Sequence, residues 1–323
     1  LDRGTGVRRL EVDGVRPPVA SVGNLTAGGT GKSPFVAWAA RELAAVGASP
    51  VIAMRGYRGA PDGRGGLVSD EALEYGSTAP DARIVVGARR REALERALHE
   101  TGGARDAVVV LDDGFQHRML ARDLDVVLVD ATRPGLDGDL LPNGWLREPA
   151  QGIARAGLVV LTKADDGDAR ARAAASVRRW RGMAHDASCV HDWTGLEVFG
   201  GPGGDGSASR ATPVRALEGV RVVSACALGN PTHFHAMVER AGARIAVRLE
   251  KADHRAFAAE ELESAARRAG ATLVVASRKD LVKLVRMPAV ELAVPRLGLR
   301  FLEGEDRVRA ALASLVSARG ARA

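Results

Sequence analysis

Near the start of the chain stands Val22-Gly23-Asn24-Leu25-Thr26-Ala27-Gly28-Gly29-Thr30-Gly31-Lys32-Ser33-Pro34, the stretch that decides the predicted fold. A short apolar segment, 18–22, comes before it and an amphipathic segment, 35–46, follows it, which predicts a strand, a glycine-rich turn and a helix. Glycines let successive backbone N–H groups turn inward around phosphate oxygens, while Lys32 can reach the β- and γ-phosphates of a nucleotide. The Ser33 hydroxyl can ligate Mg²⁺, and the helix N-terminus adds partial positive charge.

The strict phosphate-loop pattern, G-x-x-x-x-G-K-[ST], is incomplete, because Thr26 holds the place of its first glycine. A glycine turn that only precedes a helix is the alternative interpretation. The position of the glycines between a predicted strand and a predicted helix favours a nucleotide site. The residues expected to bind the nucleotide are Thr26, Ala27, Gly28, Gly29, Thr30, Gly31, Lys32 and Ser33.

Length and composition restrict the class of protein. The chain has 323 residues, 46% of them hydrophobic, which is enough for two α/β domains. Cys189 and Cys226 lie far apart and form no C-x-x-C pair, which argues against a disulfide framework or a zinc site and favours two buried thiols. No apolar run reaches about 18 residues, so the sequence predicts no membrane-spanning helix.

The net charge of +6 comes mainly from arginine, in runs such as Arg89-Arg90-Arg91 and Arg178-Arg179. Solvated helix faces are one explanation of these runs, and attraction to an anionic surface such as acidic lipid headgroups is the other. No aromatic-studded basic strand or basic helix-turn-helix stands out, so nucleic acid is not expected as a partner. The sequence also gives no sign of an obligate protein partner.

Apolar strands alternate with amphipathic helices after the first loop, which predicts a P-loop NTPase-type α/β domain with a mostly parallel sheet. The strand that begins at Ala107 ends in Asp112 and Asp113. Carboxylates at such a place can hold Mg²⁺ opposite Ser33, although two adjacent aspartates can also form a turn. Residues 1–17 are predicted to be polar and irregular. The strands after the loop are expected at 50–54, 84–86, 107–113, 125–130 and 157–162.

A glycine-rich, low-complexity break at 200–209 marks the predicted boundary between two domains, and a second, smaller α/β pattern follows it. Strands near 194–199 and 296–302 are expected to pair as a two-stranded hinge. The first domain is therefore expected to span 1–193, completed by a C-terminal helix within 304–323 that packs back on it, and the second domain to span 194–303.

A set of short motifs runs in one order along the chain: Gly23 to Pro34, Arg55-Gly56-Tyr57, Asp70-Glu71, Asp112-Asp113-Gly114-Phe115-Gln116-His117, Ala121-Arg122-Asp123-Leu124, Leu140-Leu141-Pro142, Leu146-Arg147-Glu148-Pro149, Gly229-Asn230-Pro231 and Asp253-His254. Together they resemble the tetraacyldisaccharide 4'-kinases, the lipid A 4'-kinases of Gram-negative bacteria. The resemblance is collinear from about Pro18 to Glu305. The motifs that begin at Asp112 and Leu146 are specific to that family, and Thr in place of the first loop glycine is usual in it.

The resemblance implies ATP-dependent phosphorylation of the 4'-hydroxyl of an acylated glucosamine disaccharide 1-phosphate, which yields lipid IVA. ATP and Mg²⁺ are the cofactors that it implies. It also implies an enzyme at the cytoplasmic face of the bacterial inner membrane, in peripheral contact with anionic lipid.

The same resemblance assigns roles to single residues. Taken alone, Asp70 at the start of a predicted short helix would be an N-cap. The family pattern instead makes Asp70 the general base, paired with His254 of the second domain, so closure about the hinge would assemble the site. Lys32 and Arg147 would act on the transferring phosphoryl group. The metal ligands would be Ser33, Asp112 and Asp113, and the substrate-binding residues Arg55, Tyr57, Glu71, Gln116, His117 and Glu148.

Three features depart from the family pattern. The family usually has an amphipathic or membrane-embedded helix before the first strand, and no such segment stands before the strand predicted here. Arg255 stands where the family usually has a second histidine after Asp-His. Ser277-Arg278-Lys279-Asp280 stands where it usually has Thr-Glu-Lys-Asp.

Two other classes of protein remain open on the residues alone. In a P-loop GTPase or metallochaperone-like NTPase, Thr162-Lys163-Ala164-Asp165 would read guanine, although Asn is expected where Thr162 stands. Such a protein would bind GTP far better than ATP. A nucleotide-binding module without catalysis, which holds nucleic acid through basic patches, would lose that binding steeply as salt rises.

Overall fold

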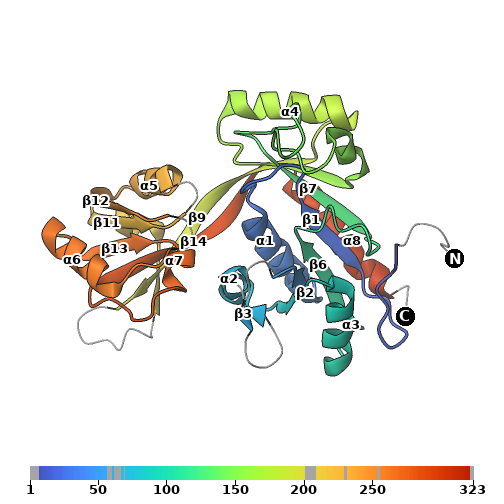
Figure 1. Ribbon diagram of the computed structural model, residues 1–323, viewed down its shortest axis with the longest axis horizontal. Helices are drawn as coiled ribbons and strands as arrows, with labels where there is room; N and C mark the ends of the chain where they lie inside the picture. The colour runs from blue at the N-terminus through green and yellow to red at the C-terminus, as the bar shows by residue number, and fades with distance from the viewer. Residues whose placement is uncertain are drawn as a thin grey trace. The chain divides into compact units, whose positions relative to one another are not determined.

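The computed structural model describes residues 7–56, 60–61, 67–68, 70–200, 209–228, 231–252 and 255–320, and within 60–71 and 318–320 it describes the backbone only. The chain divides into two compact units. The first is formed by 1–191 together with 299–323, and the second by 192–298. Each is an α/β structure, and Figure 1 colours the chain by residue number so that both can be followed.

The first unit is built on a sheet with the strand order β9-β8-β7-β1-β6-β2-β5. Neighbouring strands in it run parallel, as the sequence predicts. Their carboxyl ends therefore share one edge, where the loops after β1, β6, β7 and β8 meet. The strands are β1 (Val19–Gly23), β2 (Ser49–Met54), β5 (Arg83–Val86), β6 (Ala107–Asp112), β7 (Leu124–Asp130), β8 (Leu158–Thr162) and β9 (Ala187–Phe199).

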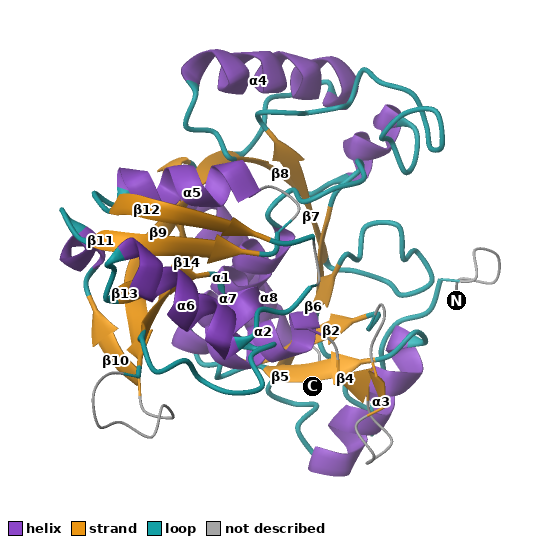
Figure 2. Ribbon diagram, turned by 60° about the vertical axis from the view of Figure 1, so that its left-hand side comes forward, coloured by secondary structure: helices purple, strands orange, loops and turns teal. Residues whose placement is uncertain are grey.

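Helices cover the sheet of the first unit (Figure 2). The final helix, α8, buries Val308, Leu312 and Leu315 in the same apolar core as Phe35 and Leu43 of α1. These three α8 residues recur at i, i+4 and i+7, the spacing that puts side chains on one helix face. The last helix therefore shares an apolar core with α1 in the first unit. The helices of this unit are α1 (Lys32–Ala45), α2 (Asp70–Thr78), α3 (Arg90–Thr101), α4 (Gly167–Arg181) and α8 (Glu305–Gly320), with a short 3₁₀ helix at Ala150–Arg155.

The segment before β1 is irregular apart from isolated bridges, as predicted, but it is not wholly polar. Leu10 and Val12 are only 2% and 4% exposed and lie in a core with residues of β1, β2 and β6. Arg8 forms a parallel bridge with Leu120. The prediction was wrong for this part because two isolated apolar residues among charges carry no periodic signal, although a long-range contact buries them.

The second unit has the strand order β12-β11-β13-β14-β9, with β10 antiparallel to β9. Its core gathers apolar side chains on both sheet faces, among them Val223 on one and Val222 on the other. The strands are β10 (Ser209–Thr212), β11 (Arg221–Cys226), β12 (Arg244–Glu250), β13 (Leu273–Ala276) and β14 (Glu291–Glu303). The helices are α5 (Pro231–Arg240), α6 (Ala259–Ala269) and α7 (Arg278–Leu281), with a 3₁₀ helix at Val214–Leu217.

The two strands predicted as a hinge, 194–199 and 296–302, belong to β9 and β14, which are hydrogen-bonded neighbours. Both strands are longer than expected and begin at Ala187 and Glu291. The glycine-rich break at 200–209 is not a domain boundary. Ser209 pairs with Phe199 in the β9–β10 ladder, so the break joins two strands of one unit, and its residues 201–208 lie outside the described part of the chain.

Cys189 and Cys226 are free, fully buried thiols. Burial raises the pKa of each to about 12, so both remain protonated and act as small apolar side chains. Their interpretation as buried residues is confirmed. Among the residues that the structure describes, no helix has the length and apolar character needed to cross a bilayer.

Candidate active site

The phosphate loop joins β1 to α1, and its first part is held as an extended segment. Thr26 forms an antiparallel bridge with Leu146, and the Leu25 carbonyl accepts a hydrogen bond from the Arg147 N–H at 2.7 Å. The Asn24 amide donates to the Thr26 carbonyl at 2.6 Å. An extended residue needs no left-handed backbone, which explains why Thr can stand where the strict pattern has glycine.

The end of the loop does need glycine. Gly31 has φ of +80° and precedes the first residue of α1. A Cβ at this position would lie 2.3 Å from two ring atoms of His191, which comes from β9. Both the left-handed backbone and the close imidazole therefore disfavour a side chain.

Gly31→Ala is expected to weaken nucleotide binding and to lower the melting temperature, because the methyl clashes with His191 and the left-handed backbone costs about 1–2 kcal/mol. His191→Ala in the same chain should relieve the clash but not the backbone cost, so the double variant should recover only part of the affinity. Calorimetric nucleotide titration and thermal melting measure both effects. Wild-type affinity in Gly31→Ala would contradict the tight geometry of the loop.

Three charged side chains meet in front of the loop. The Lys32 ammonium lies 3.4 Å from Oδ1 of Asp113 and 3.1 Å from Oδ1 of Asn24. The Arg147 guanidinium donates to both oxygens of Asp113 at 2.8 Å. Burial raises the pKa of Asp113, but Lys32 and Arg147 outweigh burial and hold the pKa below its usual value. The site therefore presents an ionised carboxylate between two cations.

Asp112 lies deeper, with an exposed fraction of 6%. Its Oδ2 accepts a hydrogen bond from the Tyr75 hydroxyl at 2.9 Å, and the same hydroxyl is hydrogen-bonded to Ser33. Burial and the charge of Asp112 raise the pKa of Tyr75 well above its usual value, so its phenol stays protonated. A carboxylate and a hydroxyl thus meet at one place beside a helix N-terminus, and such hard oxygen ligands fit Mg²⁺.

Tyr75 is a site residue that sequence reasoning missed. It is fully buried and lies on α2, the helix that begins at Asp70. The signal in the sequence was a single tyrosine on a helix predicted to border the site, because the hydroxyl of a buried tyrosine usually makes a hydrogen bond.

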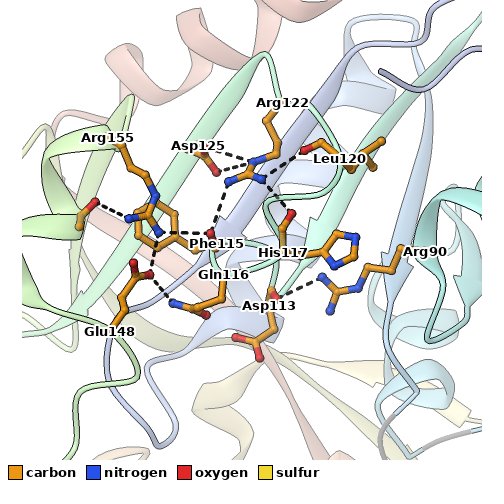
Figure 3. A network of polar contacts seen from close by, with 11 residues as sticks. Arg90, Asp113, Phe115, Gln116, His117, Leu120, Arg122, Asp125, Glu148 and Arg155 are labelled. Carbon is orange, nitrogen blue, oxygen red and sulfur yellow. Dashed lines mark hydrogen bonds and ion pairs between the residues drawn. The ribbon is translucent and has the colours of Figure 1, made fainter. Parts of the chain in front are cut away.

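The loop that follows β6 is fixed by three arginines (Figure 3). Arg90 donates to the Asp113 carbonyl at 3.1 Å, and Arg122 donates to the His117 carbonyl at 2.8 Å. Arg155 lies over the Phe115 ring, 3.9 Å from its centroid. These contacts engage backbone oxygens and a ring face of the loop rather than its polar side chains.

Those side chains border a pocket of about 440 Å³ in the first unit. Burial and the nearby guanidinium of Arg90 lower the pKa of His117, which keeps its imidazole neutral at pH 7. The pocket is therefore positively charged through its arginines rather than through histidine. Its lining residues are Arg55, Ala88, Arg90, Asp113, Gln116, His117 and Arg147.

Arg90 belongs to an arginine run for which a solvated helix face was one explanation, yet it is 5% exposed and lines this pocket. Glu148, which is expected to bind substrate, accepts from Gln116 at 2.9 Å and from Arg155 at 2.7 Å. The carboxylate of Glu148 therefore holds the Gln116 amide in place. Of the remaining predicted site residues, Tyr57 and His254 and the side chains of Asp70 and Glu71 lie outside the described part of the chain.

A parallel sheet with a phosphate loop after β1, acidic residues after β6 and a cationic pocket beside them defines a P-loop phosphotransferase. Residues 7–317 match the family model described as tetraacyldisaccharide-1-P 4'-kinase. The chain belongs to the tetraacyldisaccharide 4'-kinase family and is an ATP-dependent kinase.

Curated relatives and a solved structure agree with this placement. A tetraacyldisaccharide 4'-kinase of Anaeromyxobacter dehalogenans is 38% identical over 322 residues, 92% of this chain and 81% of the relative. One from Geobacter sulfurreducens is 35% identical over 281 residues, 83% of this chain and 74% of the relative. The fold resembles that of "apo" form LpxK from Aquifex aeolicus in complex with ATP, with a TM-score of 0.66, 24% identity and coverage of 95% of this chain and 91% of the other.

Proposed function

We propose that this chain transfers the γ-phosphoryl group of ATP to the 4'-hydroxyl of tetraacyldisaccharide 1-phosphate, giving lipid IVA for lipid A biosynthesis. The convergence of Lys32 and Arg147 on Asp113, beside a cationic pocket, is the observation that carries the proposal. Two cations at this place stabilise negative charge on a transferring phosphoryl group. The alternative of a GTPase is not favoured, because the family match covers nearly the whole chain.

The phosphate loop holds the nucleotide in this proposal. Residues 26–33 supply backbone N–H groups and the positive end of α1, which suit the phosphates of ATP. Lys32 and Arg147 neutralise the transferring group. Mg²⁺, when bound, would offset the negative charge of the phosphates. Ser33 and Asp112 are the ligands best placed for the ion, with Asp113 beside them.

The acceptor side of the site is assigned to the pocket. Arg55 and His117 offer donors to a sugar phosphate headgroup. The side-chain NH₂ of Gln116 donates to the Asn24 carbonyl and to Glu148, so Gln116 offers its amide oxygen as an acceptor for a sugar hydroxyl. Tyr57 and Glu71 are proposed to add to the same surface. Asp70, aligned by His254, takes the proton of the attacking hydroxyl, so the oxygen becomes a better nucleophile as the phosphoryl group leaves ADP.

The direct test supplies Mg·ATP and tetraacyldisaccharide 1-phosphate in detergent and follows the product by mass spectrometry. A product heavier by one phosphate, with ATP preferred over GTP, is expected. Turnover of ATP that does not depend on the lipid acceptor, or a clear preference for GTP, would overturn the proposal.

The enzyme is proposed to act as a peripheral protein at the cytoplasmic face of the inner membrane, because the acyl chains of its acceptor lie in a bilayer. Leu140, Leu141 and Trp145 have exposed fractions of 46%, 51% and 52%, on the segment that contacts the phosphate loop. Apolar side chains and Trp at a surface favour the lipid interface.

Binding to anionic vesicles is therefore expected, weakening as salt rises because the charges are screened. Leu140→Glu should reduce the bound fraction in a vesicle co-sedimentation assay, whereas Met183→Glu, at another exposed apolar residue, serves as the matched control. A protein that ignores anionic vesicles at low salt would contradict this membrane contact.

A further inference from the structure

Two carbonyls of the phosphate loop are held by residues from the end of β8. The Thr162 hydroxyl, fully buried, donates to the Thr30 carbonyl at 2.8 Å. The Lys163 ammonium donates to the Gly29 carbonyl at 2.7 Å. The same ammonium lies 2.5 Å from Oδ2 of Asp130, at the end of β7. These contacts join the loop to two neighbouring strands of the sheet.

The direction of a carbonyl sets the direction of the next N–H, because the two point opposite ways across a trans peptide. With the Gly29 carbonyl held by Lys163, the N–H of Thr30 points away from Lys163. With the Thr30 carbonyl held by Thr162, the N–H of Gly31 likewise points away from the strand ends. Two consecutive N–H groups are thereby turned away from Thr162 and Lys163, and N–H groups of a phosphate loop are the donors that bind phosphate oxygens.

The backbone of Lys163 supports the same interpretation. Its φ is +51°, a left-handed conformation that is uncommon for residues other than glycine and is disfavoured. The Asp130 side chain is only 10% exposed. Its other oxygen, Oδ1, accepts a hydrogen bond from the Thr132 hydroxyl at 2.6 Å, which fixes the carboxylate. The left-handed backbone of Lys163, its ion pair with Asp130 and the hydrogen bond from Thr132 therefore all support one contact with the loop.

We propose that Thr162 and the Lys163–Asp130 pair are positioning residues that hold the phosphate loop in its nucleotide-binding conformation before the nucleotide arrives. The inference rests on the proposed function only in taking the loop as the ATP site. In this proposal the side chains of Thr162 and Lys163 hold backbone carbonyls of the loop and do not read a guanine base.

The test measures the dissociation constant of a non-hydrolysable ATP analogue by calorimetry, without any lipid acceptor. Lys163→Met should weaken binding about tenfold, the loss expected when a hydrogen bond from a charged donor disappears. Lys163→Arg, which can still donate, should keep most of the affinity. Thr162→Val should weaken binding several-fold, whereas Thr162→Ser, which keeps the hydroxyl, should bind nearly as well as the wild type. Lys283→Met, in the other unit, is the matched control and should bind as the wild type does.

Coupling between the variants gives a second measure. Asp130→Asn should also weaken binding, and adding it to Lys163→Met should cost nothing further, because one ammonium makes both contacts. In turnover assays the KM for ATP should rise while kcat at saturating ATP and the KM for the lipid stay near wild type.

Wild-type analogue binding in both Lys163→Met and Thr162→Val would overturn the proposal. So would a loss confined to kcat at saturating ATP, since that would place Lys163 in the chemical step. Melting temperatures measured for every variant separate weak binding from poor folding. Because no acceptor is present in the binding experiment, failure to phosphorylate the lipid would count against the proposed function and would leave these affinities as they are.

Discussion

Lys32→Ala is expected to lower kcat by about 10²–10³-fold, the loss typical when one preorganised donor is removed from a developing negative charge. The Lys32 side chain is only 15% exposed, so water cannot fully replace its charge. The fold should persist, because Asp113 keeps both hydrogen bonds from Arg147. Phosphate transfer to the lipid acceptor at saturating ATP measures the effect, and a thermal melt confirms folding.

Two comparisons sharpen this test. Lys279→Ala removes a lysine that belongs to the second unit and not to the phosphate loop, and it should retain activity. The joint loss of Asp112 and Asp113 should also abolish transfer. In a variant that lacks Asp112, added Mg²⁺ should not restore the transfer. Full turnover by Lys32→Ala would show that the loop does not carry the transferring phosphate.

Asp70→Ala is expected to lower kcat by about 10²–10⁴-fold, the range for loss of a general base. His254→Ala should lower it by somewhat less, since the histidine acts by aligning the carboxylate. The double variant should match Asp70→Ala, because a partner cannot help a base that is gone. The affinity for ATP should be nearly unchanged in all three variants, since neither residue belongs to the phosphate loop.

Asp70→Asn is the deciding control for this pair. Asp70 is the first residue of α2, where Asn satisfies backbone N–H groups as well as Asp does. A residue that only stabilises the helix start, by about 1 kcal/mol, would therefore tolerate Asn with full activity. Wild-type kcat in Asp70→Asn would end the general-base assignment, and multiplicative losses in the double variant would end the pairing with His254.

Patterns that are local in the chain were enough to predict much of this protein. The phosphate loop, the alternation of strands and helices, and the acidic end of β6 each occupy one continuous stretch. Their chemistry depends on residue type and spacing, so the α/β class and the parallel sheet could be predicted. The family motifs are of the same kind, and the match over 7–317 agrees with them.

The sheet order decided what the local patterns could not. β1 lies between β6 and β7, and β8 lies next to β7, so side chains far apart in the chain meet at the loop. Thr162 and Lys163 contact the phosphate loop for this reason, whereas their motif alone had left a guanine site open as an alternative. Tyr75 joins Ser33 to Asp112 for the same reason.

Burial was also decided by tertiary structure. Arg90 stands in a run of arginines whose sequence is that of a solvated face, yet it is buried with its guanidinium on the Asp113 carbonyl. Leu10 and Val12 stand among charges, yet they belong to the core. A side chain is buried when contacts with a distant part of the chain stabilise it more than contacts with water do. Those contacts depend on which elements come together in space, and a linear pattern does not contain that information.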